Sequence, residues 1–264
     1  MSVLLRMASD PPNRGYALAA ITPSISVGAP IVRRAAIEAT TGSYELSNKS
    51  RSVIDQRDLP CCVSCALSSA MEIIDTGAPA LSPLFHYYVT RYDNGGANTD
   101  GFLNLDDGLD TLTNEGICSR TLHSPPFTVA GTATKPSAEA YADALTRALG
   151  RRGIHLRYTL LGGPSMVVAI REELAQDHPV VIGIQLPMGY PGAFLNSRLE
   201  WLDPQNPPLS QSGHCVLAVG YNDVRTSLHI QDSRGRSAFD GGLWWMGYRI
   251  VDSGVVQEAY SLIP

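Results

Sequence analysis

Residues 55–72 carry the side chains with the clearest potential for chemistry. Gln56 lies in a short loop, and Cys62 follows six residues later, where a run of helix-forming residues begins. A cysteine attacks a carbonyl as its thiolate, and a position at a helix N-terminus lowers the pKa of the thiol. The segment therefore predicts a nucleophilic thiol at Cys62.

Three further groups complete a possible reaction centre. His214 stands far downstream, at the start of an apolar run typical of a buried strand. If the fold brings His214 beside Cys62, its protonated imidazole stabilises the thiolate and acts as general acid towards a leaving amine. Gln56 and the backbone N–H of Cys62 would donate hydrogen bonds to an oxyanion, and Asp232, which ends the next β-rich run, would orient His214. This set predicts a cysteine hydrolase.

Cys62 and Cys65 also form a Cys-x-x-Cys pattern, which leaves other interpretations open. Cys65 could be the nucleophile, although this requires an insertion after Gln56 relative to the spacing that the hydrolase interpretation uses. The pair could be a redox pair or half of a zinc site, but a zinc site needs a second ligand cluster. Cys118 and Cys215 stand alone in the sequence. We therefore prefer Cys62 as nucleophile and expect no metal and no organic cofactor.

Composition limits the classes of partner. The chain has 264 residues, 44% of them hydrophobic, and a net charge of −5. No basic surface that favours nucleic acid is expected, and no apolar run approaches a membrane span. Arg6 interrupts the first residues, which lack the apolar core of a secretory signal. We expect a polypeptide or small-molecule partner, and a cytoplasmic location or export without a cleaved signal.

Periodicity predicts a helical half followed by a strand-rich half. Apolar residues at three- and four-residue spacing, with Ser-Pro, Gly and Asn signals at the ends, predict the helices, and β-rich runs bounded by turn residues predict the strands. A cleft between the two halves is the natural place for a site. The expected helices are residues 62–74, 83–91, 104–115, 137–149 and 165–176, and the expected strands are residues 155–160, 179–186, 214–221, 227–231 and 243–250.

Over residues 45–264 the chain resembles the papain-like cysteine proteases, in particular their compact bacterial members. Gln56 and Cys62 have the family's spacing of oxyanion-hole Gln and nucleophile, and Glu72 matches a buried Glu on the helix that follows. Residues 212–221 resemble the strand with the catalytic His, and residues 232–235 resemble the family's Asn-Ser-Trp-Gly.

The resemblance implies an α+β, two-lobed papain-like fold with an active-site cleft between the lobes. Residues 45–126 would form the mainly helical lobe with the nucleophile, and residues 127–264 an antiparallel β-barrel-like lobe with the catalytic His. It implies a thiol endopeptidase that cleaves polypeptides through an acyl-enzyme on Cys62. Residues 1–44 would be an N-terminal extension that occupies the cleft as an intramolecular inhibitor until it is removed, as in a zymogen.

Several residues depart from the family's pattern. Cys61 and Val63 replace the usual neighbours of the nucleophile, Asp232 replaces the triad Asn, and Arg234 replaces the Trp that shields the triad. Another tryptophan, in the pair at residues 244 and 245, is a candidate to take over that shielding. The departures keep two alternatives open. One is an inactive relative that uses the cleft to bind proteins, and the other is a transferase or deamidase with the same triad.

Overall fold

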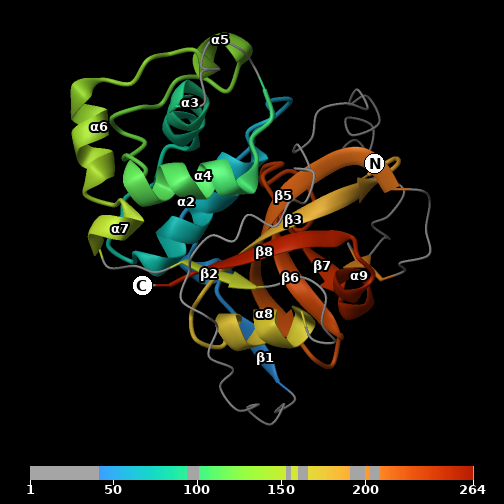
Figure 1. Ribbon diagram of the computed structural model, residues 1–264. Coiled ribbons are helices and arrows are strands. Elements are labelled where there is room, and N and C mark those ends of the chain that lie inside the picture. The colour runs from blue at the N-terminus through green and yellow to red at the C-terminus, as the bar shows by residue number, and fades with distance from the viewer. Residues whose placement is uncertain are drawn as a thin grey trace.

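The computed structural model describes residues 42–93, 101–152, 156–159, 166–190, 200–202 and 209–263. Of the N-terminal extension expected over residues 1–44, residues 1–41 lie outside the described residues. One group of helices and one large sheet lie side by side, with α2 at the boundary between them (Figure 1). This is the α+β, two-lobed arrangement that the sequence predicted.

The helical lobe is built around α2, which is buried along nearly its whole length. Its buried residues are mainly apolar, as in a helix of a protein core, and Leu67, Ala70 and Met71 are fully buried. The hydroxyl of Ser82 accepts a hydrogen bond from the Phe85 N–H at 3.2 Å, so it caps the next helix as the Ser-Pro signal predicted. The helices of this lobe are α2 (Cys62–Ile74), α3 (Pro83–Asp93), α4 (Leu105–Asn114), α5 (Val129–Thr132), α6 (Ala138–Leu145) and α7 (Leu149–Arg152).

The strands form one sheet in the order β2-β8-β3-β5-β6-β7-β4, and β1 pairs with β5. All pairs are antiparallel except β4 with β7. The strands are β1 (Ser43–Glu45), β2 (Leu156–Thr159), β3 (Val180–Pro187), β4 (Glu200–Trp201), β5 (Leu209–Asn222), β6 (Ser227–Gln231), β7 (Leu243–Gly247) and β8 (Val256–Leu262). Within the described strands the two ends of this order, β2 and β4, do not pair. The sheet is therefore open. The prediction of a barrel-like lobe is wrong in this respect.

Several segments differ from the sequence-based expectation. The helix expected over residues 137–149 is instead α6 and the start of α7, and α5 and β4 were not expected. Residues 248–250 were expected to extend a strand, but they begin α9 (Tyr248–Asp252), because the Tyr248 N–H leaves the ladder and donates to the carbonyl of Thr226 at 2.9 Å. Residues 129–152 were expected with the strand-rich lobe, but Tyr141 of α6 packs its ring against Phe85 of α3 at 5.3 Å between centroids. Ser43 and Tyr44 pair with β5, so the body of the protein begins before residue 45.

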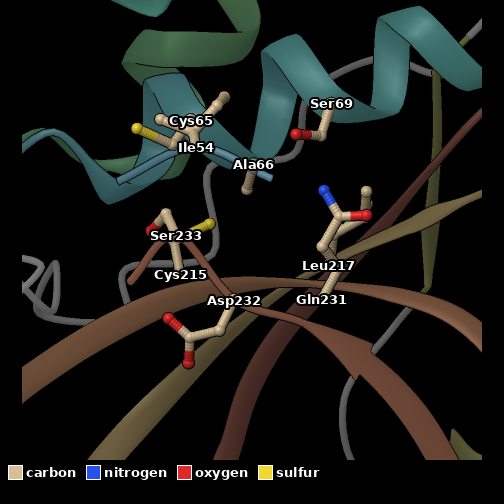
Figure 2. Close-up of a pocket in the computed structure, with 9 residues that line it drawn as sticks. All are labelled: Ile54, Cys65, Ala66, Ser69, Cys215, Leu217, Gln231, Asp232 and Ser233. Carbon is tan, nitrogen blue, oxygen red and sulfur yellow. The ribbon is translucent and has the colours of Figure 1, made fainter. Parts of the chain in front are cut away.

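The two lobes meet where α2 crosses β5. Ala66 and Ser69 of α2 and Leu217 of β5 are buried against one small interior cavity, whose lining Figure 2 shows. α8 (Met166–Leu174) packs on the strands away from this contact (Figure 1). Among the described residues, no helix has the length and apolar character needed to cross a membrane.

Candidate active site

Cys62 is the first residue of α2, as the sequence predicted, and it is 1% exposed. The first N–H groups of a helix have no partner within the helix, so the N–H of Cys62 is available as a donor. The Cys62 side chain interacts with the imidazole of His214, and this interaction is one cause of the raised pKa of that imidazole. The fold therefore brings together two groups that lie 152 residues apart in the sequence.

His214 lies on β5 and forms an ion pair with Asp232. The distance from His214 Nε2 to Asp232 Oδ1 is 3.0 Å, which leaves Nδ1 as the ring nitrogen for Cys62. Burial by itself would lower the pKa of His214. The charge and hydrogen bond of Asp232 outweigh burial and raise that pKa to about 9. His214 is therefore held as an imidazolium at neutral pH.

Asp232 is held as a carboxylate by three donors. Its Oδ1 faces His214, and its Oδ2 accepts hydrogen bonds from the Tyr190 hydroxyl at 2.9 Å and from Trp244 Nε1 at 3.2 Å. Burial acts to raise the pKa of Asp232, but the charge and hydrogen bond of His214, followed by the charge of Arg234 and the hydrogen bond from Tyr190, lower it to about 2. A buried carboxylate is stable only with such partners. Asp232 thus orients His214 and keeps it charged.

Tyr190 and Trp244 form an aromatic cover over this ion pair. The ring of Tyr190 lies 6.1 Å from that of His214 and 6.3 Å from that of Trp244, measured between centroids. Arg234, which stands at the family's Trp position, has its guanidinium carbon 5.6 Å from the centroid of the Tyr190 ring. Trp244 is thus the tryptophan that covers the triad, whereas Trp245 stacks on His229 at 4.1 Å. From the sequence alone, either Trp244 or Trp245 could have covered the triad.

Tyr190 is the site residue that sequence reasoning missed. It stands in a Gly- and Pro-rich segment with no periodicity and no motif. Its hydroxyl donates to Asp232 Oδ2, and its contact with Asp232 depends on a sequence separation of 42 residues. No local sequence pattern indicates a contact over this separation, so only the tertiary structure identifies Tyr190 as a site residue.

Gln56 lies close to the triad in a loop that other residues hold rigidly. Its Nε2 donates to the carbonyl of Leu59 at 2.7 Å, and its Oε1 accepts from the hydroxyl of Ser233. A primary amide has two N–H groups, and the second makes no hydrogen bond to the described residues. This N–H and the N–H of Cys62 are the two donors that an oxyanion would use.

Backbone hydrogen bonds tie the Gln56 loop to the Asp232 loop. The Gln56 N–H donates to the carbonyl of Ser233 at 2.8 Å, and the Gly235 N–H donates to the carbonyl of Ile54 at 2.9 Å. Gly235 has φ +80°, and a Cβ there would lie 3.0 Å from the Cβ of Asp55. Glycine is required at this close approach. The two loops form one unit that carries both the oxyanion donor and the orienting carboxylate.

The structure argues against Cys65 as the nucleophile. Its Sγ lies 3.8 Å from the Sγ of Cys61, and burial raises its pKa well above the ordinary value. A buried thiol with a raised pKa is a poor nucleophile. Cys65 and Cys215 both line the interior cavity between α2 and β5 (Figure 2). All five cysteines are free and buried, and the described residues contain no group of His, Cys, Asp and Glu that could hold a metal ion.

Two other polar residues of the helical lobe have structural roles. Glu72 is fully buried and accepts hydrogen bonds from the N–H groups of Leu81 at 2.8 Å and Arg51 at 3.1 Å, as expected for a structural group. His86 is held between the Ser64 hydroxyl and the carbonyl of Gly108, at 2.8 and 2.9 Å. Burial lowers the pKa of His86 to about 4, so it is neutral. Neither takes part in the site.

Comparison with known proteins gives matches in structure only. No family model matches the chain, and no curated protein matches it in sequence. Among solved structures, xylellain, a cysteine protease from Xylella fastidiosa, is similar with 25% identity and a TM-score of 0.73, over 85% of this chain and 87% of that one.

Two further structures resemble the chain at 18% identity. The Carica candamarcensis cysteine protease CMS1MS2, in complex with E-64, has a TM-score of 0.58 over 85% of this chain and 99% of that one. Digestive procathepsin L 3 of Tenebrio molitor larval midgut has a TM-score of 0.65 over 100% of this chain and 80% of that one. At this identity the likeness shows the fold. It agrees with the resemblance found in the sequence.

Proposed function

We propose that this chain, which has the fold of the papain-like cysteine proteases, is a thiol peptidase that cleaves polypeptides through an acyl-enzyme on Cys62. The observation that carries the proposal is that His214 contacts Cys62 on one side and Asp232 on the other. A thiol at a helix N-terminus contacts an imidazole whose other nitrogen is held by a buried carboxylate. This is the arrangement that activates a cysteine nucleophile.

The geometry assigns a role to each group. The Cys62 thiolate attacks the peptide carbonyl, and the N–H groups of Cys62 and Gln56 stabilise the oxyanion. His214 donates its Nδ1 proton to the departing amine nitrogen as the C–N bond breaks. It then takes a proton from water, whose oxygen attacks the acyl-enzyme, and the C–S bond breaks to release the carboxylic acid and Cys62. Asp232 stays ionised throughout and orients the ring.

Selective alkylation tests the proposal. The protein is treated with an electrophilic epoxide of the kind that alkylates papain-like thiols, and the added mass is located by peptide mapping. We expect rapid labelling at Cys62 alone and loss of peptide cleavage in step with labelling. Cys118→Ser, at a buried thiol away from the site, serves as the control and should label as wild type does. Slow and equal labelling of all five cysteines would instead favour a protein-binding scaffold.

We further propose that the N-terminal segment inhibits the site until it is removed. The support is its position ahead of the family-like region and the likeness to a procathepsin structure. The test compares peptidase activity of the full chain with that of a chain starting at Gly42, which retains β1 and its pairing with β5. We expect higher activity after truncation at unchanged thermal stability. Equal peptidase activities of the full and the truncated chain, both folded, would contradict inhibition by the N-terminal segment.

A further inference from the structure

Three thiols stand together at the start of α2. Cys61 is the N-cap residue, Cys62 begins the helix, and Cys65 follows three residues later. All three are free and buried. The proposed peptidase reaction uses the thiol of Cys62 alone. The thiols of Cys61 and Cys65 therefore need an explanation of their own.

The sulfur atoms of Cys61 and Cys65 are in contact, 3.8 Å apart. The Cys65 N–H donates to the carbonyl of Cys61 at 3.0 Å, which is the i to i+4 hydrogen bond of an α-helix. This spacing places two Cα atoms about 6 Å apart, and disulfides bridge Cα atoms that are roughly 4.4–6.8 Å apart. Rotation of the two side chains, at a helix end where the backbone frays, can therefore close the pair into a disulfide.

Cys65 also lies near Cys62, with which it forms the Cys-x-x-Cys pattern of the sequence. This pattern at a helix N-terminus is typical of a reactive first thiol with a second thiol one turn later. Burial first, then the hydrogen bond and charge of Cys61, and then the charge of Cys62 raise the pKa of Cys65, so it neighbours both. Cys62, by contrast, contacts the imidazolium of His214. An oxidant therefore reacts at Cys62, and Cys65 stays a thiol until an oxidised sulfur is presented to it.

We propose that Cys62, Cys65 and Cys61 form a thiol relay that reduces hydroperoxides and returns the Cys62 nucleophile to its reduced state. The Cys62 thiolate attacks one peroxide oxygen, the O–O bond breaks, and the leaving oxygen takes a proton from His214 as an alcohol or water. Cys65 attacks the sulfur of the Cys62 sulfenic acid, and the S–O bond breaks to release water, which includes the Cys65 proton. Cys61 then attacks the sulfur of Cys65 and expels the Cys62 thiolate, and the Cys61 proton restores the imidazolium. Two thiols are oxidised to the Cys61–Cys65 disulfide, and one hydroperoxide is reduced.

The last exchange runs towards the Cys61–Cys65 disulfide because Cys62 is the best leaving group of the three. Its thiolate is stabilised by the imidazolium of His214, and a thiol that is stable as thiolate leaves fastest in disulfide exchange. The oxidation is then stored in a pair that the peptidase reaction does not use. Cys62 escapes the irreversible step to sulfinic acid. The inference goes beyond the proposed peptidase and shares with it only the reactive thiol of Cys62.

One equivalent of hydrogen peroxide, added to the reduced full chain, tests the relay. Free thiols are trapped with a maleimide in acid, disulfides are then reduced and labelled with a second reagent, and fragmentation of the peptide that carries all three cysteines locates both labels. We expect wild type to show a disulfide between Cys61 and Cys65 and a free thiol at Cys62. Peptide cleavage should stay close to that of untreated protein, because the nucleophile is regenerated.

Two variants stop the relay at different steps. In Cys65→Ala, peroxide should leave added oxygen on Cys62 and lower peptide cleavage by at least about tenfold, and a dithiol reductant should not fully restore it, because oxidation continues to the sulfinic acid. In Cys61→Ser, the relay should stop at a Cys62–Cys65 disulfide with a similar loss, which the reductant reverses completely. Serine is a favourable N-cap residue, so this variant keeps the helix start. Before peroxide both variants should label at Cys62 with the epoxide as wild type does, and Cys118→Ser should match wild type throughout.

The label map separates failure of the relay from failure of the peptidase. Wild type that gains oxygen on Cys62 while Cys61 and Cys65 stay free would overturn the relay, and its epoxide labelling before peroxide would leave the peptidase standing. A disulfide from Cys62 to Cys215, which lines the cavity from β5 (Figure 2), would also overturn the relay. A Cys61–Cys65 disulfide in a protein that cleaves no peptide would support the relay and reject the peptidase. A Cys62 that reacts with neither peroxide nor epoxide would reject both.

Discussion

At the scale of single residues, the site depends on one buried ion pair. Asp232 replaces the amide that the family usually has, and it brings a full charge into the core. The charge is tolerated because His214, Tyr190 and Trp244 all donate to it. Since the folded pKa of His214 is raised to about 9 and that of Asp232 is lowered from 3.8 to about 2, the pair's stability is complete between about pH 3.8 and 6.5. It is lost as pH rises through about 9 and as pH falls through about 2.

The first prediction concerns pH. Asp232→Asn removes the charge that favours the imidazolium, so the basic limb of the kcat/KM profile should move down from its wild-type position near pH 9. Activity should persist, because an amide oxygen still accepts from His214. Stability should fall by about 1–3 kcal/mol, because the amide nitrogen would meet the donor Nε1–H of Trp244.

The pH–rate profile of each variant and its urea unfolding measure these effects. Asp240→Asn, at an exposed carboxylate on a neighbouring loop, is the control and should change neither the profile nor the stability. A basic limb that stays in place in Asp232→Asn would reject Asp232 as the partner of His214.

At the scale of elements, the site is built from one helix end, one strand and two joined loops. α2 presents Cys62, β5 presents His214, and the paired loops present Gln56 and Asp232. The loops have no regular structure of their own. They keep their positions because each satisfies the other's backbone groups, as buried backbone requires. Catalytic geometry should therefore be sensitive to the spacing between these loops.

The second prediction tests that coupling. Gly235→Ala should separate the loops, because the new Cβ would lie 3.0 Å from Cβ of Asp55. Gly254→Ala is the matched control: Gly254 has φ +86°, similar to the +80° of Gly235, but a Cβ there meets nothing within 4 Å. Both should lose about 1–2 kcal/mol of stability from the left-handed backbone. Only Gly235→Ala should also lose peptidase activity, as measured by kcat. Equal kcat values for both variants would contradict the coupling.

At the scale of the whole molecule, the reaction centre exists only where the two lobes meet. Cys62 belongs to the helical lobe, whereas His214 and Asp232 belong to the sheet. The contact of α2 with β5 therefore fixes the distance between Cys62 and His214, the proposed nucleophile and base. Leu217, which is 1% exposed, lies in this contact next to Gln231 and faces Ala66 and Ser69 of α2 (Figure 2).

The third prediction concerns this contact. Leu217→Ala should destabilise the protein by about 2–5 kcal/mol, because it enlarges a cavity in the core. Unfolding should remain one cooperative transition, since both lobes lose the same contact. Val224→Ala, at a side chain that is 97% exposed, should change stability by less than about 0.5 kcal/mol. Calorimetry measures both, and two separate transitions in wild type would show that the lobes fold independently.

Local patterns in the sequence were sufficient for the longer helices and most of the strands, whereas the four-residue helices α5 and α7 were not predicted as such. The three- and four-residue spacing in α2 and the Ser82-Pro83 cap act over one or two turns, so they can be read without the fold. The candidates Cys62, His214, Asp232 and Gln56 followed from chemistry together with the family's spacing. The short strands β1 and β4 and the turn into α9 were not predicted, because pairing with distant strands defines them.

The sequence by itself determined which side chains could react and the order in which they occur. Only the tertiary structure decided their distances, the burial of Cys65 against Cys61, and the contact of Trp244 and Tyr190 with Asp232. The physical reason is range. Propensity and capping act between neighbours along the chain, whereas burial, ion pairing and strand register depend on residues that are close in space and far apart in sequence.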